Sequence, residues 1–242
     1  METPRTYLRT FFYSEVENPP GAPNPTWLIE PIVAIPGVEN IYDGGKAILF
    51  SNHLWRQGFN DAVKGALGRP VIAANTLGLV INSARYRSQH QMHIHVSALS
   101  AEFASCLAAL DLPAASPQLQ WQPSTCTLRY FATTARAWLY AARVDTLDNV
   151  SGVAWEGMSG DGWADFIGGA AALTPRTDTA VALASAGDGD GYVVVLAAGA
   201  GDVGDHNMLD YDPPSAEAEA QAEAEAEAAL LKDTAPPVDA SV

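Results

Sequence analysis

The segment Gln91-Met92-His93-Ile94-His95-Val96-Ser97 alternates polar and apolar residues without interruption. A period of two residues is typical of a half-buried β-strand. The polar side chains then share one face of the strand, and the apolar side chains share the face that can enter a core. His93 and His95 therefore point the same way, about 7 Å apart along the strand. That spacing is short enough for both imidazoles to act on one phosphate or to bind one metal ion.

The composition limits the classes of protein that fit this chain. Its 242 residues suit one large domain or two small ones, and a hydrophobic content of 48% can build a core. The formal net charge of −15 argues against general binding to nucleic acid, which needs a basic surface. We therefore expect no nucleic-acid partner. The same charge disfavours attraction to an anionic membrane face.

The chain divides into three predicted parts. Residues 1–27 are rich in Pro and Asn and are expected to form an irregular lead-in to a domain at 28–212. Residues 213–242 are rich in Ala and Glu, with seven acidic residues and one lysine. Their Glu residues recur every second position, which leaves no apolar stripe on a helix. We therefore expect this tail to be disordered or a loose helix.

The hydrophobic pattern predicts an α+β domain with an antiparallel sheet and helices between strand pairs. The predicted strands are residues 32–35, 77–81, 91–99, 125–131, 179–184 and 192–197, and the predicted helices are 51–67 and 101–110. Ser51 and Asn52 are candidate caps for the first helix, and Ser100 is the candidate cap for the second. Residues 134–144 fit a helical or mixed segment, and residues 151–172 fit no single pattern.

Cysteine content and hydropathy bear on the compartment. Cys106 and Cys126 are the two cysteines and lie outside any CxxC pair, so they fit either one disulfide or two buried thiols. The N-terminal segment lacks the apolar core of a signal peptide, and no stretch approaches the roughly 20 apolar residues of a membrane span. We expect a soluble protein, cytoplasmic by default.

Several kinds of site fit the histidine strand. Histidines on the open face of a strand can simply be solvated. A His-x-His pair can supply two zinc ligands, but the acidic residue of the cupin pattern is missing at Leu99 and Ser100. The two-histidine phosphoesterase pattern needs a second His-x-Ser/Thr copy, which neither His53 nor His206 provides. The remaining alternative is an imidazole nucleophile that attacks a phosphoanhydride, supported by polar side chains of the adjoining hairpin.

The run from Leu79 to Ser97 resembles bacterial CDP-diacylglycerol pyrophosphatases, which belong to the histidine-triad (HIT-like) superfamily. That family reads approximately I-N-S-x-x-G-R-[ST]-Q-x-x-φ-H-I-H-I-S, where φ is apolar, and the similarity extends less densely over residues 28–200. The resemblance implies a HIT-like antiparallel sheet with flanking helices. It also implies hydrolysis of CDP-diacylglycerol to CMP and phosphatidate through a nucleotidyl-histidine intermediate, without a cofactor or metal.

The resemblance also assigns roles to individual residues. It implies that His93 is the nucleophile and that His95 contacts the phosphate oxygens. Gln91 stands where the triad has its first histidine, and Tyr86 stands where the family has a glycine. The adjoining hairpin supplies the other candidate residues, which are Ser88 for catalysis and Asn82, Arg85, Arg87 and Gln89 for substrate binding.

The departure at Gln91 leaves two further functions open. One is a hydrolase or nucleotidyltransferase that acts on soluble nucleotide conjugates. The other is a non-catalytic module that binds a nucleotide or a metal. The expected partner is a CDP-lipid or another nucleotide conjugate, with no membrane span, and the fold is compatible with peripheral membrane contact and with a homodimer.

Overall fold

The computed structural model describes most of the predicted domain. The described residues are 11–15, 27–31, 46–66, 70–85, 92–116, 118–130, 133–168, 173–174, 177–186, 191–199, 203 and 205–210. The predicted strand at 32–35 and the acidic tail at 213–242 lie outside these residues. No helix among the described residues is long and apolar enough to cross a membrane.

An eight-stranded antiparallel sheet forms the centre of the fold, with the strand order β1-β2-β4-β3-β7-β8-β6-β5. The strands are β1 (Phe11–Glu15), β2 (Trp27–Pro31), β3 (Leu77–Ile81), β4 (Ile94–Ala98), β5 (Gln122–Tyr130), β6 (Thr133–Val144), β7 (Ala180–Ser185) and β8 (Tyr192–Gly199). The predicted α+β class with an antiparallel sheet is therefore confirmed.

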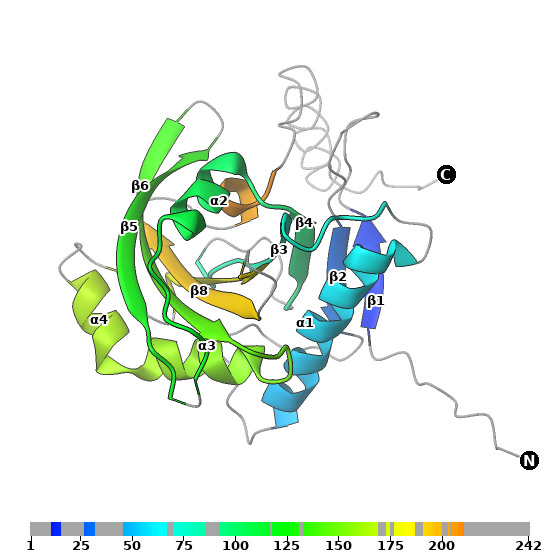
Figure 1. The fold of residues 1–242 in the computed structure, drawn as a ribbon, viewed down its shortest axis with the longest axis horizontal. Coiled ribbons are helices and arrows are strands. Elements are labelled where there is room, and N and C mark those ends of the chain that lie inside the picture. The colour runs from blue at the N-terminus through cyan, green and yellow to red at the C-terminus, as the bar shows by residue number, and fades with distance from the viewer. Residues whose placement is uncertain are drawn as a thin grey trace, which may run out of the picture.

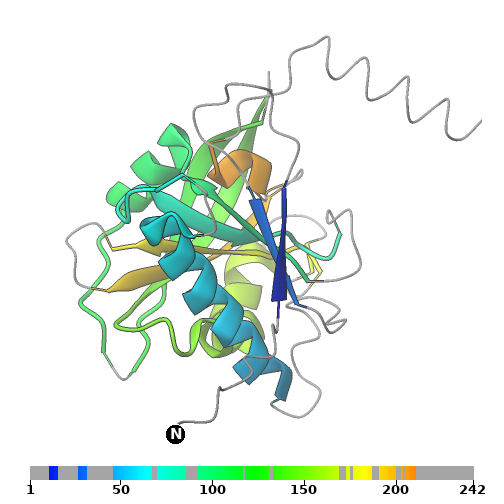
Figure 2. The same ribbon diagram turned by 90° about the vertical axis from the view of Figure 1, so that its right-hand side faces the viewer.

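Among the described residues, five helices cover the two faces of this sheet. They are α1 (Lys46–Lys64), α2 (Ala101–Ala108), α3 (Val150–Ser159), α4 (Asp161–Gly168) and α5 (Asp205–Met208). Figure 1 shows α2 beside the orange segment that contains α5, while α3 and α4 lie along the other side of the curved strands β5 and β6. Turned by a quarter, the view in Figure 2 shows α1 running diagonally across the sheet.

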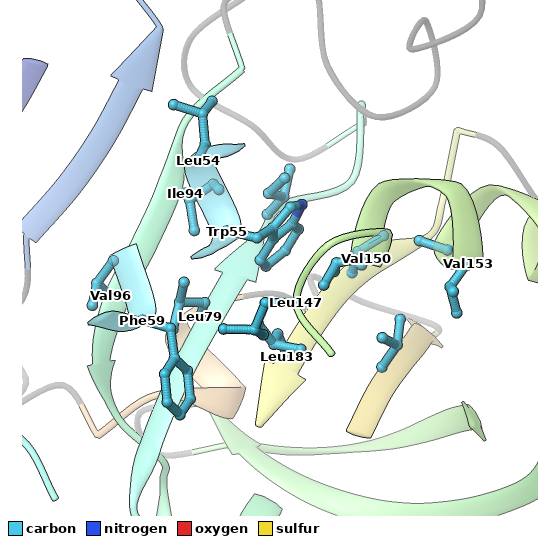
Figure 3. Packing of buried hydrophobic residues seen from close by; sticks show 14 of the residues in the cluster. Leu54, Trp55, Phe59, Leu79, Ile94, Val96, Leu147, Val150, Val153 and Leu183 are labelled. Atoms are coloured by element: carbon cyan, nitrogen blue, oxygen red, sulfur yellow. The ribbon is translucent and has the colours of Figure 1, made fainter. Parts of the chain in front are cut away.

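The larger core lies between the sheet and the helices α1, α3 and α4. Leu54, Trp55 and Phe59 on α1 recur at helical spacing and pack on Leu79 and Ile94 of the neighbouring strands. Figure 3 shows these side chains converging with residues of α3. The predicted amphipathic helix is confirmed, and its apolar stripe faces the core as the spacing requires. Burial of such side chains stabilises the fold by about 1.5–3 kcal/mol for each.

The second core fills the opposite face of the sheet. Phe103 of α2 and Met208 of α5 are fully buried there against Val80, Leu139 and Ala182 of the strands. The predicted cap of α2 is confirmed, because the hydroxyl of Ser100 accepts the N–H of Phe103 at 3.2 Å. A disulfide joins Cys106 of α2 to Cys126 of β5, with their Cα atoms 6.1 Å apart. The structure thus selects the disulfide from the two cysteine alternatives.

Other expectations about local structure need correction. The segment expected to be an irregular lead-in contains β1, which pairs with β2. Residues 133–144 form a strand rather than a helical segment, and the unassigned residues 151–172 contribute α3 and α4. Helix α1 begins at Lys46, so Ser51 and Asn52 lie inside it and do not cap it. The histidine strand is shorter than 91–99, because β4 begins at Ile94.

Candidate functional site

The structure brings His93 and His95 together on one side of the sheet. His95 lies within β4, and His93 lies immediately before that strand. Their ring centroids are 4.9 Å apart, and the ring planes are inclined by 60°. The alternation of the sequence explains this placement, because Ile94 and Val96 enter the larger core and turn the two imidazoles to the opposite face. Both histidines are buried, with 3% and 8% of their surface exposed.

Asn82 contacts this pair from the neighbouring strand. It follows the end of β3, whose Val80 is paired with His95. The side-chain nitrogen Nδ2 of Asn82 lies 3.5 Å from Nε2 of His95, and Asn82 is itself buried. This amide can therefore orient the His95 ring and present a polar group to a ligand at the histidines.

Arg85 lies in the turn that follows β3. Its backbone N–H donates to the carbonyl of Thr177 at 3.1 Å, and its Nε lies 2.7 Å from Oδ1 of Asp178. Ile81 at the end of β3 pairs with Val181 at the start of β7, so the Arg85 turn and the Thr177 segment meet at one end of the sheet. His93 lies at this same end, since β4 runs antiparallel to β3.

The remaining predicted site residues lie outside the described part of the chain. These are Gln91 and Ser88, predicted for catalysis, and Arg87 and Gln89, predicted for substrate binding. Their roles stay predictions. The described part of the site thus consists of His93, His95, Asn82 and Arg85.

Sequence reasoning missed a buried carboxylate beside the histidines. Glu30 on β2 is 7% exposed. Leu28 of the same strand pairs with His95, and Ile29 pairs with Ile94, so continuing this register by one residue puts Glu30 opposite His93. Residues that face each other in neighbouring strands have Cβ atoms about 5 Å apart. The sequence does not mark the face of this carboxylate, because the three residues before it on β2 are all apolar, and the strand pairing cannot be read from the sequence.

The described residues lack the ligand sets that metal ions require. Among them, no group of three or more His, Cys, Asp or Glu side chains is arranged to hold a metal ion. Structural zinc sites need four protein ligands and catalytic zinc sites need three. The paired imidazoles and the amide of Asn82 are groups that can hydrogen-bond to a phosphate.

A separate cavity of about 360 Å³ lies away from the histidines. It is lined largely by apolar side chains, including Leu99, Leu107 and Val193, with Arg143 as its cationic residue. Leu99 follows His95 by four residues, about 13 Å of extended chain. Neither His93 nor His95 lines this cavity, so the cavity is not part of the candidate site.

The fold and the site define an α+β protein with one histidine in β4, a second immediately before that strand, and an arginine at the same end of the sheet. The chain belongs to the CDP-diacylglycerol pyrophosphatase family, whose model matches residues 26–149. The matched range runs from β2 to β6 and includes Glu30, Asn82, Arg85, His93 and His95.

Other comparisons add little to this assignment. A solved structure of a DUF4931 family protein from Bacillus cereus ATCC 10987 is similar over 92% of this chain and 96% of that chain. Its sequence identity is 6% and its TM-score is 0.38. No curated protein matches the chain.

Proposed function

We propose that this protein is a hydrolase of the histidine-triad (HIT-like) type that cleaves the phosphoanhydride bond of CDP-diacylglycerol. The products are CMP and phosphatidate. Membership of the CDP-diacylglycerol pyrophosphatase family supports CDP-diacylglycerol as the substrate. The observation that carries the mechanism is the pair His93 and His95, whose rings lie 4.9 Å apart on one face of the sheet.

The reaction has two displacement steps. A ring nitrogen of His93 attacks the cytidylyl phosphorus and forms a P–N bond, while the anhydride P–O bond breaks and its electron pair leaves on the phosphatidate oxygen. Water then attacks the same phosphorus, releases CMP and restores the free imidazole. His95, oriented by Asn82, donates a hydrogen bond to the phosphoryl oxygens as negative charge develops.

The experiment is an assay of CMP release from CDP-diacylglycerol in detergent micelles by the purified chain. Replacement His93→Ala is expected to lower kcat by about a thousandfold or more, because the nucleophile is lost. His53→Gln is the matched control, since His53 lies on α1, which packs on the opposite face of the sheet. Full activity of His93→Ala would reject the mechanism, whereas a nucleotidyl adduct found on His93 by mass spectrometry would support it.

A second candidate function follows from Gln91, which occupies the position of the first triad histidine. This change favours transfer of the nucleotidyl group, or hydrolysis of soluble nucleotide conjugates. The same assay with a water-soluble CDP-alcohol separates the two candidates. Faster turnover of the soluble compound than of the lipid would select the second function.

A further inference from the structure

Arg85 is fixed at two points by the segment that precedes β7. Its backbone N–H donates to Thr177, and its guanidinium forms an ion pair with Asp178 through Nε, at 2.7 Å. These contacts restrain both the backbone and the side chain of the residue. The ion pair thus limits the positions open to the guanidinium before any ligand arrives, which lowers the entropy lost on binding.

Asp178 is itself firmly held. Its side chain is 1% exposed, and its second carboxylate oxygen accepts the backbone N–H of Thr174 at 2.6 Å. Its own backbone N–H donates to the carbonyl of Thr174 at 2.9 Å. A buried carboxylate is costly without a cationic partner, so this site specifies a cation at position 85.

The ion pair leaves part of the guanidinium available. Asp178 engages Nε, and in the part of the chain that the structure describes no other acceptor is recorded for Arg85. The Arg85 side chain is 46% exposed. Its two terminal nitrogens form the planar pair of donors that binds a phosphate through two parallel hydrogen bonds.

The location relates this donor pair to the histidines. Asn82, which contacts His95, precedes Arg85 by three residues, and such a segment spans at most about 10 Å. In a chain with a net charge of −15, a phosphate needs a local cation of this kind. The imidazoles and the guanidinium therefore suit two linked phosphates better than a single one.

We propose that Arg85 binds the second phosphate of a diphosphate ligand, and that Asp178 is the residue that positions Arg85. This inference rests on the proposed function for the identity of the two phosphates. His93 attacks the first phosphorus, and the electron pair of the broken P–O bond moves onto the phosphate that leaves. Arg85 compensates the charge that develops on this leaving group, so the site selects diphosphates over monophosphates.

A second ion pair provides a matched control. Arg56 on α1 lies 2.7 Å from Asp148, the same separation as between Arg85 and Asp178. Both side chains of this pair are exposed, at 50% and 63%. A pair so exposed contributes little and holds no ligand group in place. The replacement Asp148→Asn therefore removes an equivalent contact without affecting the site.

The test measures binding by calorimetry, with methylene diphosphonate and inorganic phosphate as probes of the full chain. Arg85→Lys keeps the charge but lacks the planar donor pair, so the Kd for the diphosphonate is expected to rise about tenfold or more. The Kd for phosphate is expected to change less than about twofold, since the imidazoles supply its contacts. Asp178→Asn should reproduce the selective loss, and Asp148→Asn should not.

The double variant that carries Arg85→Lys and Asp178→Asn tests whether Asp178 positions Arg85. If Asp178 acts through Arg85, the double variant loses no more diphosphonate affinity than Arg85→Lys alone. Additive losses would reject this role. If Asp178→Asn does not fold, Arg85→Lys and Arg85→Gln still decide the main point. Unchanged diphosphonate affinity in these variants, or an equal loss for both probes, would overturn the proposal.

The binding test does not depend on turnover. Arg85-dependent affinity for the diphosphonate without CMP release from CDP-diacylglycerol would retain the diphosphate site and reject the proposed hydrolase. Conversely, CMP release that is unaffected by Arg85→Lys would retain the hydrolase and reject the diphosphate site.

Discussion

Glu30 is the residue through which the protein can set the orientation of His93. A carboxylate that accepts the N–H of one ring nitrogen fixes the tautomer and leaves the other nitrogen free to attack. Glu30 is buried on β2, and the strand register puts it opposite His93. In the proposed mechanism, the carboxylate would also stabilise the positive charge that the imidazole acquires when it forms the P–N bond.

Replacement Glu30→Gln keeps the size of this side chain and removes its charge. We expect kcat for CMP release to fall by about 10- to 100-fold, because the ring is no longer oriented. Steady-state assays of CMP release measure the effect, with Glu156→Gln on the exposed surface of α3 as the control. An unchanged kcat in Glu30→Gln would exclude this role.

At the scale of secondary-structure elements, Asn52 joins two helices of the larger core. Its side-chain oxygen accepts the backbone N–H of Ser151 in the first turn of α3 at 2.8 Å, while the cap residue Asn149 makes no side-chain cap bond. The hydroxyl of Ser151 in turn accepts the indole N–H of Trp55 at 3.0 Å. Asn52 thus supplies from α1 the hydrogen bond that a cap residue would normally provide to α3.

The replacement Asn52→Ala is expected to lower the free energy of unfolding by about 1–2 kcal/mol, since it removes this bond and leaves the Ser151 N–H buried without it. Urea denaturation monitored by circular dichroism measures the difference. Asn60→Ala, on the exposed face of the same helix, is the control. Because Ala has a higher helix propensity than Asn, Asn60→Ala is expected to lose no stability. A loss of similar size in both variants would show that the contact with α3 is not the cause.

The elements also show why the sequence predicts some parts of this fold and not others. The sequence predicts β3 at its observed bounds, because Leu77–Ile81 is an uninterrupted apolar run between polar turns. It does not predict β6, because Trp138 and Tyr140 pack on one core while Leu139 and Ala141 pack on the other, so no polar face marks a period of two. Local alternation predicts the histidine pair, whereas Arg85 and Asp178 meet across a separation that no local pattern reveals.

At the scale of the whole molecule, the two cores pack on opposite faces of the sheet. The larger core, under α1, α3 and α4, fixes the inward face of β4. The other face carries the histidines at one end of the strands and the second core beside them. That second core is covered by two short helices, of eight and four residues. Isolated helices of this length are unstable in water, so their attachment to the sheet must come from tertiary contacts.

The disulfide is the covalent part of that attachment. It joins α2 to β5, the edge strand of the sheet, across a sequence separation of 20 residues. Closing a loop of that length in the unfolded chain stabilises the folded state by about 3 kcal/mol. We expect the double variant Cys106→Ser and Cys126→Ser to lose about this much free energy of unfolding in denaturant titrations. Reduction of the original chain should lower stability to the same level, and added reductant should leave the double variant unchanged. Equal stability of oxidised and reduced chains would show that noncovalent packing alone holds α2 on the sheet.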